Sequence, residues 1–221
     1  MKKNIPNIIT LCNLCSGCLA VMAAFESDYK WALIFVIISA VFDFLDGFAA
    51  RLLKAYSLIG KELDSLADLI SFGFAPAMVA VSLLNELGSY SFIGLLIVAF
   101  SALRLAKFNV DDRQTDSFIG LPTPANAILW VGMGFTYNQF FSENPHITLA
   151  LVALTSCLLI SNLPMFSLKS KNFGFNQNKW QYILIFTSII LLIVLQLNAT
   201  MWIITLYILL SVAKSLFDRV R

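Results

Sequence analysis

The sequence consists largely of long apolar segments that are separated by short polar links. A helix needs about 20 mostly apolar residues to cross a bilayer, and roughly eight segments meet this length. They cover residues 7–25, 31–53, 63–85, 90–108, 121–141, 146–166, 180–197 and 200–217. Of the 221 residues, 59% are hydrophobic and 13% are charged, whereas a soluble domain has about 45–50% and 25%. We therefore expect an all-α, polytopic transmembrane helical bundle that forms one domain over residues 1–221.

The cationic side chains are distributed unevenly between alternate links of this bundle. One set of links contains 14 of the 15 Lys and Arg residues, and the other set contains only Lys30. Cytoplasmic links of membrane proteins carry the excess of positive charge, so we expect both termini in the cytoplasm. The protein is thus predicted to be integral to the inner or plasma membrane of the cell. The net charge of only +2 argues against a nucleic-acid partner.

Three cysteines near the N-terminus, Cys12, Cys15 and Cys18, follow a C-x2-C-x2-C spacing. Such a spacing occurs in iron–sulfur proteins. The fourth cysteine, Cys157, lies far along the chain in another apolar segment. We therefore interpret the three as small packing residues on the first membrane helix.

Four aspartates lie where the second apolar segment ends and the third begins. Asp43 and Asp46 are three residues apart, and Asp64 and Asp68 are four apart, so each pair shares one helix face. Carboxylates inside membrane segments are costly and point to function. Four converging carboxylates repel one another unless a cation lies between them. Ligands that offer only oxygen favour Mg²⁺, Mn²⁺ or Ca²⁺, and four carboxylates suffice for a site with two ions.

Other interpretations of these aspartates are available. Each aspartate taken alone could be an acidic residue at a solvated helix end. In that case Asp64 and Asp68 would stabilise the N-terminus of their helix. Asp43 and Asp46, however, lie near the C-terminal end of their helix, where the helix dipole disfavours negative charge. A cation transporter also carries carboxylates inside the membrane, but here they gather at one face rather than at the midplane.

The aspartates belong to a longer pattern, Asp-x2-Asp-Gly-x2-Ala-Arg-x8-Gly-x3-Asp-x3-Asp, over residues 43–68. This pattern resembles the signature of the CDP-alcohol phosphotransferase family at every fixed position. The resemblance implies an enzyme that displaces CMP from CDP-diacylglycerol with the hydroxyl of a second substrate. It also implies a homodimer in which each site binds two divalent ions, Mg²⁺ or Mn²⁺.

The resemblance also implies a role for each motif residue. The metal ligands would be Asp43, Asp46, Asp64 and Asp68, and Asp68 would be the base that takes the proton from the attacking hydroxyl. The CDP-lipid would be bound by Asn7, Thr10, Gly47, Ala50, Arg51, Ser57 and Gly60. Such roles agree with the chemistry, because carboxylates act as general bases and a guanidinium binds phosphate oxygens in pairs.

Three stretches after the motif resemble the phosphatidylserine synthase branch of this family. They are residues 71–77, 102–109 and 120–126. The resemblance implies that L-serine is the acceptor, with Arg104, Lys107 and Asn109 as candidate ligands of its carboxylate. The two cations are alternatively anchors to lipid head groups at the cytoplasmic face. Glycerol 3-phosphate or inositol phosphate remains an alternative acceptor.

Overall fold

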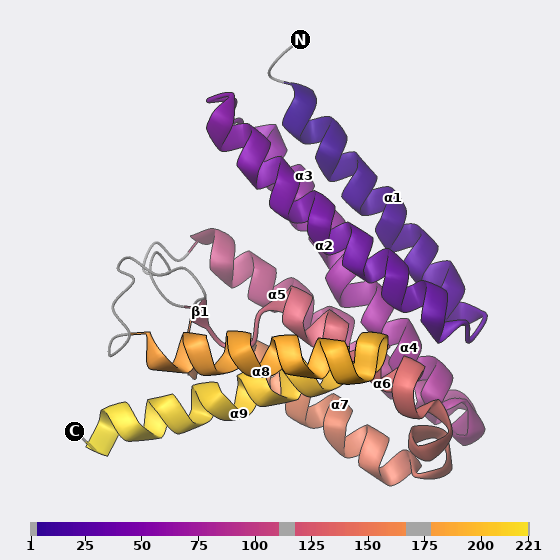
Figure 1. The fold of residues 1–221 in the computed structure, drawn as a ribbon. Coiled ribbons are helices and arrows are strands. Elements are labelled where there is room, and N and C mark those ends of the chain that lie inside the picture. Colours follow the sequence, from indigo (N-terminus) through magenta and orange to yellow (C-terminus); the bar gives the residue numbers. More distant parts are fainter. Residues whose placement is uncertain (1–3, 111–117, 167–177, 221) are drawn as a thin grey trace.

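The computed structural model describes residues 4–110, 118–166 and 178–220, and nearly all of them are helical (Figure 1). The α-helices within these ranges are α1 (Ile5–Phe25), α2 (Tyr29–Leu52), α3 (Leu58–Asp68), α4 (Ala75–Leu83), α5 (Leu96–Val110), α6 (Thr123–Glu143), α7 (Pro145–Ile160), α8 (Lys179–Leu195) and α9 (Ala199–Val220). The π-helix η2 (Leu69–Phe74) joins α3 to α4, and short 3-10 helices cover η3 (Asn85–Leu95) and η4 (Gln196–Asn198). The two-residue strands β1 (Phe118–Ile119) and β2 (Pro164–Met165) pair antiparallel.

The predicted all-α membrane bundle is confirmed. Five stretches are long and apolar enough to cross a membrane: Ile5–Phe25, Tyr29–Leu52, Leu58–Leu83, Asn85–Val110 and Lys179–Asp218. The last stretch contains two helices, because α8 and α9 fold back on each other after Gln196, whose φ is 51° (Figure 1). The predicted number of eight spans remains a prediction.

Some of the predicted helix boundaries are wrong. The third segment begins at Leu58 rather than at residue 63, because Ser57 caps the helix by accepting a 2.9 Å hydrogen bond from the amide of Gly60. The sixth segment ends at Ile160 rather than at residue 166, and an extended stretch that contains β2 follows.

The predicted orientation concerns which ends of the helices face the cytoplasm. The start of α1 and the link between α2 and α3 lie at the top of the view, whereas the end of α9 lies at the lower left (Figure 1). Six of the cationic residues on which this prediction rests lie outside the described residues, namely Lys2, Lys3, Arg113, Lys169, Lys171 and Arg221. The cytoplasmic placement of the termini therefore stays a prediction.

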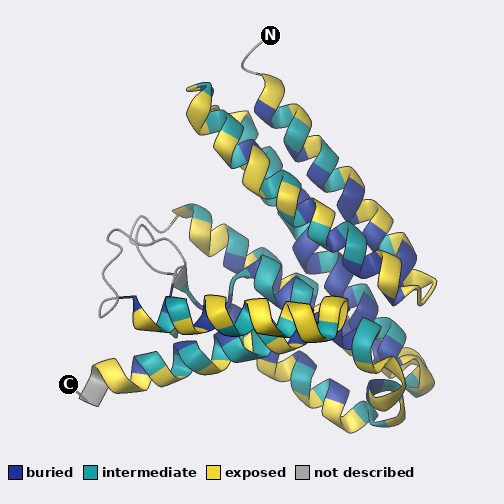
Figure 2. Ribbon diagram, viewed as in Figure 1, coloured by how far each residue is buried: buried dark blue, intermediate teal, exposed yellow. Residues whose placement is uncertain are grey.

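The main hydrophobic core lies where α1, α2, α4 and α6 meet (Figure 2). Its largest fully buried side chain is Trp130, whose indole nitrogen donates a 3.1 Å hydrogen bond to Thr155. Helix α8 is much more exposed and presents large apolar side chains such as Phe186 and Ile193. Such a surface is suited to contact with lipid chains. The core therefore holds the N-terminal helices in place, and these carry the aspartates.

The expected packing role of the N-terminal cysteines is wrong for two of them. Cys15 and Cys18 are exposed on α1, and Cys12 is only partly buried. The inner face of α1 carries instead small and polar residues such as Asn13 and Gly17. The cysteines therefore lie on the side of the helix that faces away from the other helices.

The third predicted segment is not a regular helix, because η2 interrupts it. Pro76 has no amide hydrogen, so the carbonyl of Phe72 cannot form the usual bond to the residue four positions on. The chain forms a wider turn here, in which the amide of Ala75 bonds to the carbonyl of Ile70. Gly17 lets α1 approach this turn closely, since a Cβ at Gly17 would lie 2.1 Å from Ser71 Oγ.

Candidate active site

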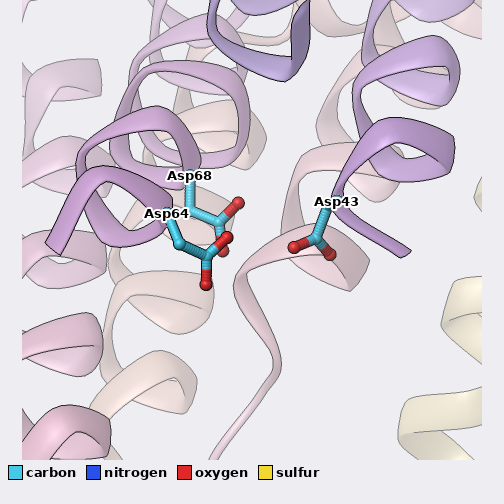
Figure 3. Close-up of side chains that lie close together, drawn as sticks. All are labelled: Asp43, Asp64 and Asp68. Carbon is cyan, nitrogen blue, oxygen red and sulfur yellow. The ribbon is translucent and has the colours of Figure 1, made fainter. Parts of the chain in front are cut away.

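Three of the four aspartates converge in the space between two helices (Figure 3). Asp43, Asp64 and Asp68 each offer one carboxylate oxygen, and these three oxygens lie within 4.8 Å of one another. Asp43 projects from α2, whereas the other two project from α3. Helices α2 and α3 both pack on α1, and this brings Asp43 close to Asp64 and Asp68.

The three carboxylates fit a divalent metal ion. All three side chains are partly buried, and Asp64 Oδ1 has no hydrogen-bond partner among the described residues. Buried charges of one sign need a partner of the opposite sign. The cluster contains neither histidine nor cysteine, so its donors are those that hard ions such as Mg²⁺ or Mn²⁺ prefer.

Asp46 lies outside this group of three carboxylates. It follows Asp43 by about one turn of α2, and its side chain is 6% exposed. Its Oδ2 accepts a 2.6 Å hydrogen bond from Thr10 Oγ1 on α1. Asp46 and Asp64 also line one pocket together, so the fourth aspartate borders the space next to the cluster.

This pocket lies between α1, the end of α2 and the start of α3. Its volume is about 210 Å³, which is below the roughly 300–1,000 Å³ of typical small-molecule sites. Its lining includes Asn7, Thr10, Gly47, Ala50, Ser57 and Gly60, which are six of the seven residues that the sequence predicts to bind the CDP-lipid. A Cβ at Gly47 would meet no atom within 4 Å, so the helix leaves open space there. The seventh residue, Arg51, is exposed and is not part of the lining.

Several residues at this site were not predicted from the sequence. Tyr56 and Lys61 line the pocket. Asn13, which is fully buried in α1, donates a 3.2 Å hydrogen bond from Nδ2 to Asp68 Oδ1. A signal for Asn13 exists, because Asn7, Thr10 and Asn13 recur every three residues and form a polar stripe on an otherwise apolar helix.

The three candidate ligands of the acceptor occupy different environments. Arg104 is buried, and its Nε donates a hydrogen bond to the carbonyl of Leu121. Lys107 is exposed near the end of α5. Asn109 contacts α3, where its Nδ2 donates a 2.8 Å hydrogen bond to Ser65 Oγ. Asn109 is therefore the one of the three whose hydrogen bonds tie it to the helix that carries Asp64 and Asp68.

The chain was compared with known proteins. The sequence model of the CDP-alcohol phosphatidyltransferase family matches residues 3–161, which include the cluster and the pocket. CDP-diacylglycerol–serine O-phosphatidyltransferase of Bacillus subtilis (strain 168) is 41% identical over 138 residues, which are 61% of this chain and 77% of that protein. The protein of the same name from Helicobacter pylori (strain ATCC 700392 / 26695) is 31% identical over 228 residues, which are 98% of this chain and 92% of that protein.

An archaeal relative has a similar name. Archaetidylserine synthase of Methanothermobacter thermautotrophicus is 32% identical over 163 residues, which are 72% of this chain and 68% of that protein. The family match spans well over half of the chain and includes all four aspartates. The chain belongs to the CDP-alcohol phosphatidyltransferase family.

Proposed function

We propose that the protein transfers the phosphatidyl group of CDP-diacylglycerol to the hydroxyl of L-serine, and that CMP and phosphatidylserine are the products. The observation that carries this proposal is the cluster of Asp43, Asp64 and Asp68 beside a pocket lined by the other motif residues. Relatives that match up to 98% of the chain are named for this reaction. Apolar helices on all sides give the lipid substrate access from the bilayer.

The proposed reaction is a direct displacement at phosphorus. The serine oxygen forms a bond to the phosphorus that carries the diacylglycerol, and the bond from this phosphorus to the CMP oxygen breaks. Asp68 takes the proton of the serine hydroxyl, so the charge of the departing CMP is balanced by a proton that stays on the enzyme. The polar lining at Asn7, Thr10 and Ser57 orients the nucleotide, and Gly47 leaves room for it.

Divalent metal ions complete the site. The cluster of three carboxylates supports at least one ion, and we propose two, Mg²⁺ or Mn²⁺, held by Asp43, Asp46, Asp64 and Asp68. When bound, they supply positive charge that neutralises the diphosphate and the leaving group. Asp46 would bind a metal ion from the wall of the pocket, where the hydrogen bond from Thr10 orients its carboxylate.

The acceptor is proposed to bind at the end of α5. Arg104 is buried and has no carboxylate partner among the described residues, so its charge is available for the carboxylate of serine. Lys107 and Asn109 lie three and five residues further along the same helix. Asn109 connects this region to α3 through Ser65.

We also propose a cytoplasmic site and a homodimer. The site lies at the bundle end that the charge distribution assigns to the cytoplasm. The homodimer rests on the family resemblance.

An assay of CMP release tests the proposal. The purified protein is reconstituted in vesicles that contain CDP-diacylglycerol, and L-serine, glycerol 3-phosphate or inositol phosphate is added with Mg²⁺ or Mn²⁺. We expect CMP release with serine, and its loss after chelation of the metal. Release with glycerol 3-phosphate but not with serine would refute the serine assignment. Ion flux across the vesicles without CMP release would favour a transporter.

A further inference from the structure

We propose that Asn13 is a positioning residue for Asp68, which holds the carboxylate of the proposed base in one orientation. This inference rests on the proposed function for the role of Asp68. It concerns a residue that lies outside the signature motif, on a different helix and 55 positions away in the sequence.

The contact itself is a hydrogen bond between two helices. Asn13 Nδ2 on α1 donates to Asp68 Oδ1 at the end of α3, at a distance of 3.2 Å. The other oxygen, Oδ2, has no hydrogen-bond donor among the described residues. One oxygen is thus held by the protein, and the other is left for the proton of the acceptor hydroxyl or for a metal ion.

The position of Asn13 is set by its backbone rather than by its side chain. Its carbonyl oxygen accepts a 3.2 Å hydrogen bond from Ser39 Oγ on α2 and a 3.1 Å hydrogen bond from Ser71 Oγ on η2. Gly17 lies one turn further along α1 and packs directly on Ser71. Asn13 therefore sits at the junction of the elements that carry Asp43 and Asp68, and a change of its side chain leaves this junction intact.

Packing alone does not explain an asparagine at position 13. Its Oδ1 is buried and has no hydrogen-bond partner among the described residues. A buried polar atom without a partner lowers stability, and an apolar side chain at this place would avoid that loss. The one described hydrogen bond of the carboxamide is the one to Asp68, so this contact is the function that the structure assigns to it.

The test compares two kinds of variant at the same junction. Asn13→Ala removes the side-chain donor but keeps the backbone carbonyl, whereas Ser39→Ala and Ser71→Ala each remove one bond to that carbonyl and keep the side chain. Asn13→Asp preserves the size of the side chain and replaces the donor by a carboxylate. The measurements are kcat and KM for CMP release, Mn²⁺ binding by electron paramagnetic resonance without substrates, and the thermal midpoint.

A positioning role predicts a selective effect. We expect Asn13→Ala and Asn13→Asp to lower kcat by about 10–100-fold and to weaken Mn²⁺ binding by a similar factor, which is usual for residues that orient metal-site carboxylates. KM for CDP-diacylglycerol and the thermal midpoint of Asn13→Ala stay near those of the wild type. Each serine variant keeps its kcat, because the second bond still holds the Asn13 backbone.

Two results would overturn the inference. One is a wild-type kcat together with wild-type Mn²⁺ binding in Asn13→Ala. The other is a loss of activity that Ser39→Ala and Ser71→Ala share to the same extent, with a lower thermal midpoint in all three. Failure of the proposed function is distinguishable, because the wild type would then release no CMP with serine, while Mn²⁺ binding would still report on the contact between Asn13 and Asp68.

Discussion

Thr10 Oγ1 donates a 2.6 Å hydrogen bond to Asp46 Oδ2 and thereby joins α1 to α2 at the wall of the pocket. Both side chains are buried, with 3% and 6% of their surface exposed. A buried carboxylate requires hydrogen-bond donors, and Thr10 provides one from a helix that lies outside the signature motif. Helix α1 is therefore part of the site as well as a membrane span.

Replacement of Thr10 tests this contact. Thr10→Val preserves the shape of the side chain but removes the hydroxyl, so Asp46 loses its donor. We expect a decrease in the free energy of unfolding of about 1–3 kcal/mol, together with a higher KM for CDP-diacylglycerol. Thr10→Ser keeps the hydroxyl and is expected to retain most of the wild-type behaviour. Equal behaviour of the valine and serine variants would contradict this role.

Gly47 tests whether the pocket must stay open. A Cβ at this position would meet no atom within 4 Å, so Gly47→Ala is expected to raise helix stability by up to about 1 kcal/mol. The methyl group nevertheless enters the pocket, and we expect a higher KM for CDP-diacylglycerol. The matched variant is Gly60→Ala, whose Cβ would lie 2.9 Å from Ser57 Oγ. It should lose stability as well as activity, and a Gly47→Ala variant with wild-type kinetics would show that ligand does not occupy this space.

Asp68 is tested by removal of its basicity. In Asp68→Asn the carboxamide keeps an oxygen that can accept the hydrogen bond from Asn13, but it cannot take a proton. We expect kcat to fall by about 10²–10⁴-fold while binding of CDP-diacylglycerol is retained. Glu62→Gln is the control, because Glu62 is an exposed acid on the same helix and lies outside the cluster. Turnover near the wild-type rate in Asp68→Asn would exclude Asp68 as the base.

Arg51 is predicted to bind the diphosphate although its side chain lies outside the lining of the pocket. Arg51→Ala should raise KM for CDP-diacylglycerol by about tenfold, which corresponds to the loss of one hydrogen bond to a charged group. KM for serine should change less. Lys54→Ala is the matched control, since Lys54 is also exposed and lies outside the pocket. If both variants behave alike, the effect is one of general surface charge.

The sequence by itself determined the membrane bundle, and it predicted the three aspartates that the structure brings together. Long apolar segments predict membrane helices without a structure, because a segment in lipid must satisfy its backbone hydrogen bonds internally, as a helix does. The pairing of Asp64 with Asp68 could be predicted equally well, since residues four apart share a helix face. Six residues of the pocket lining were also predicted. Gly47, Ala50 and Gly60 are fixed positions of the motif, whereas Asn7, Thr10 and Ser57 were predicted from the family resemblance alone.

Only the tertiary structure decided which residues contact each aspartate. It placed Asp46 against Thr10 rather than in the group of three carboxylates, and it brought Asn13 into contact with Asp68. Both contacts join helices whose relative rotation depends on packing at Gly17 and on the wide turn before Pro76. Spacing along one helix carries no information about that rotation, and so the partners of the two aspartates could not be predicted from the sequence.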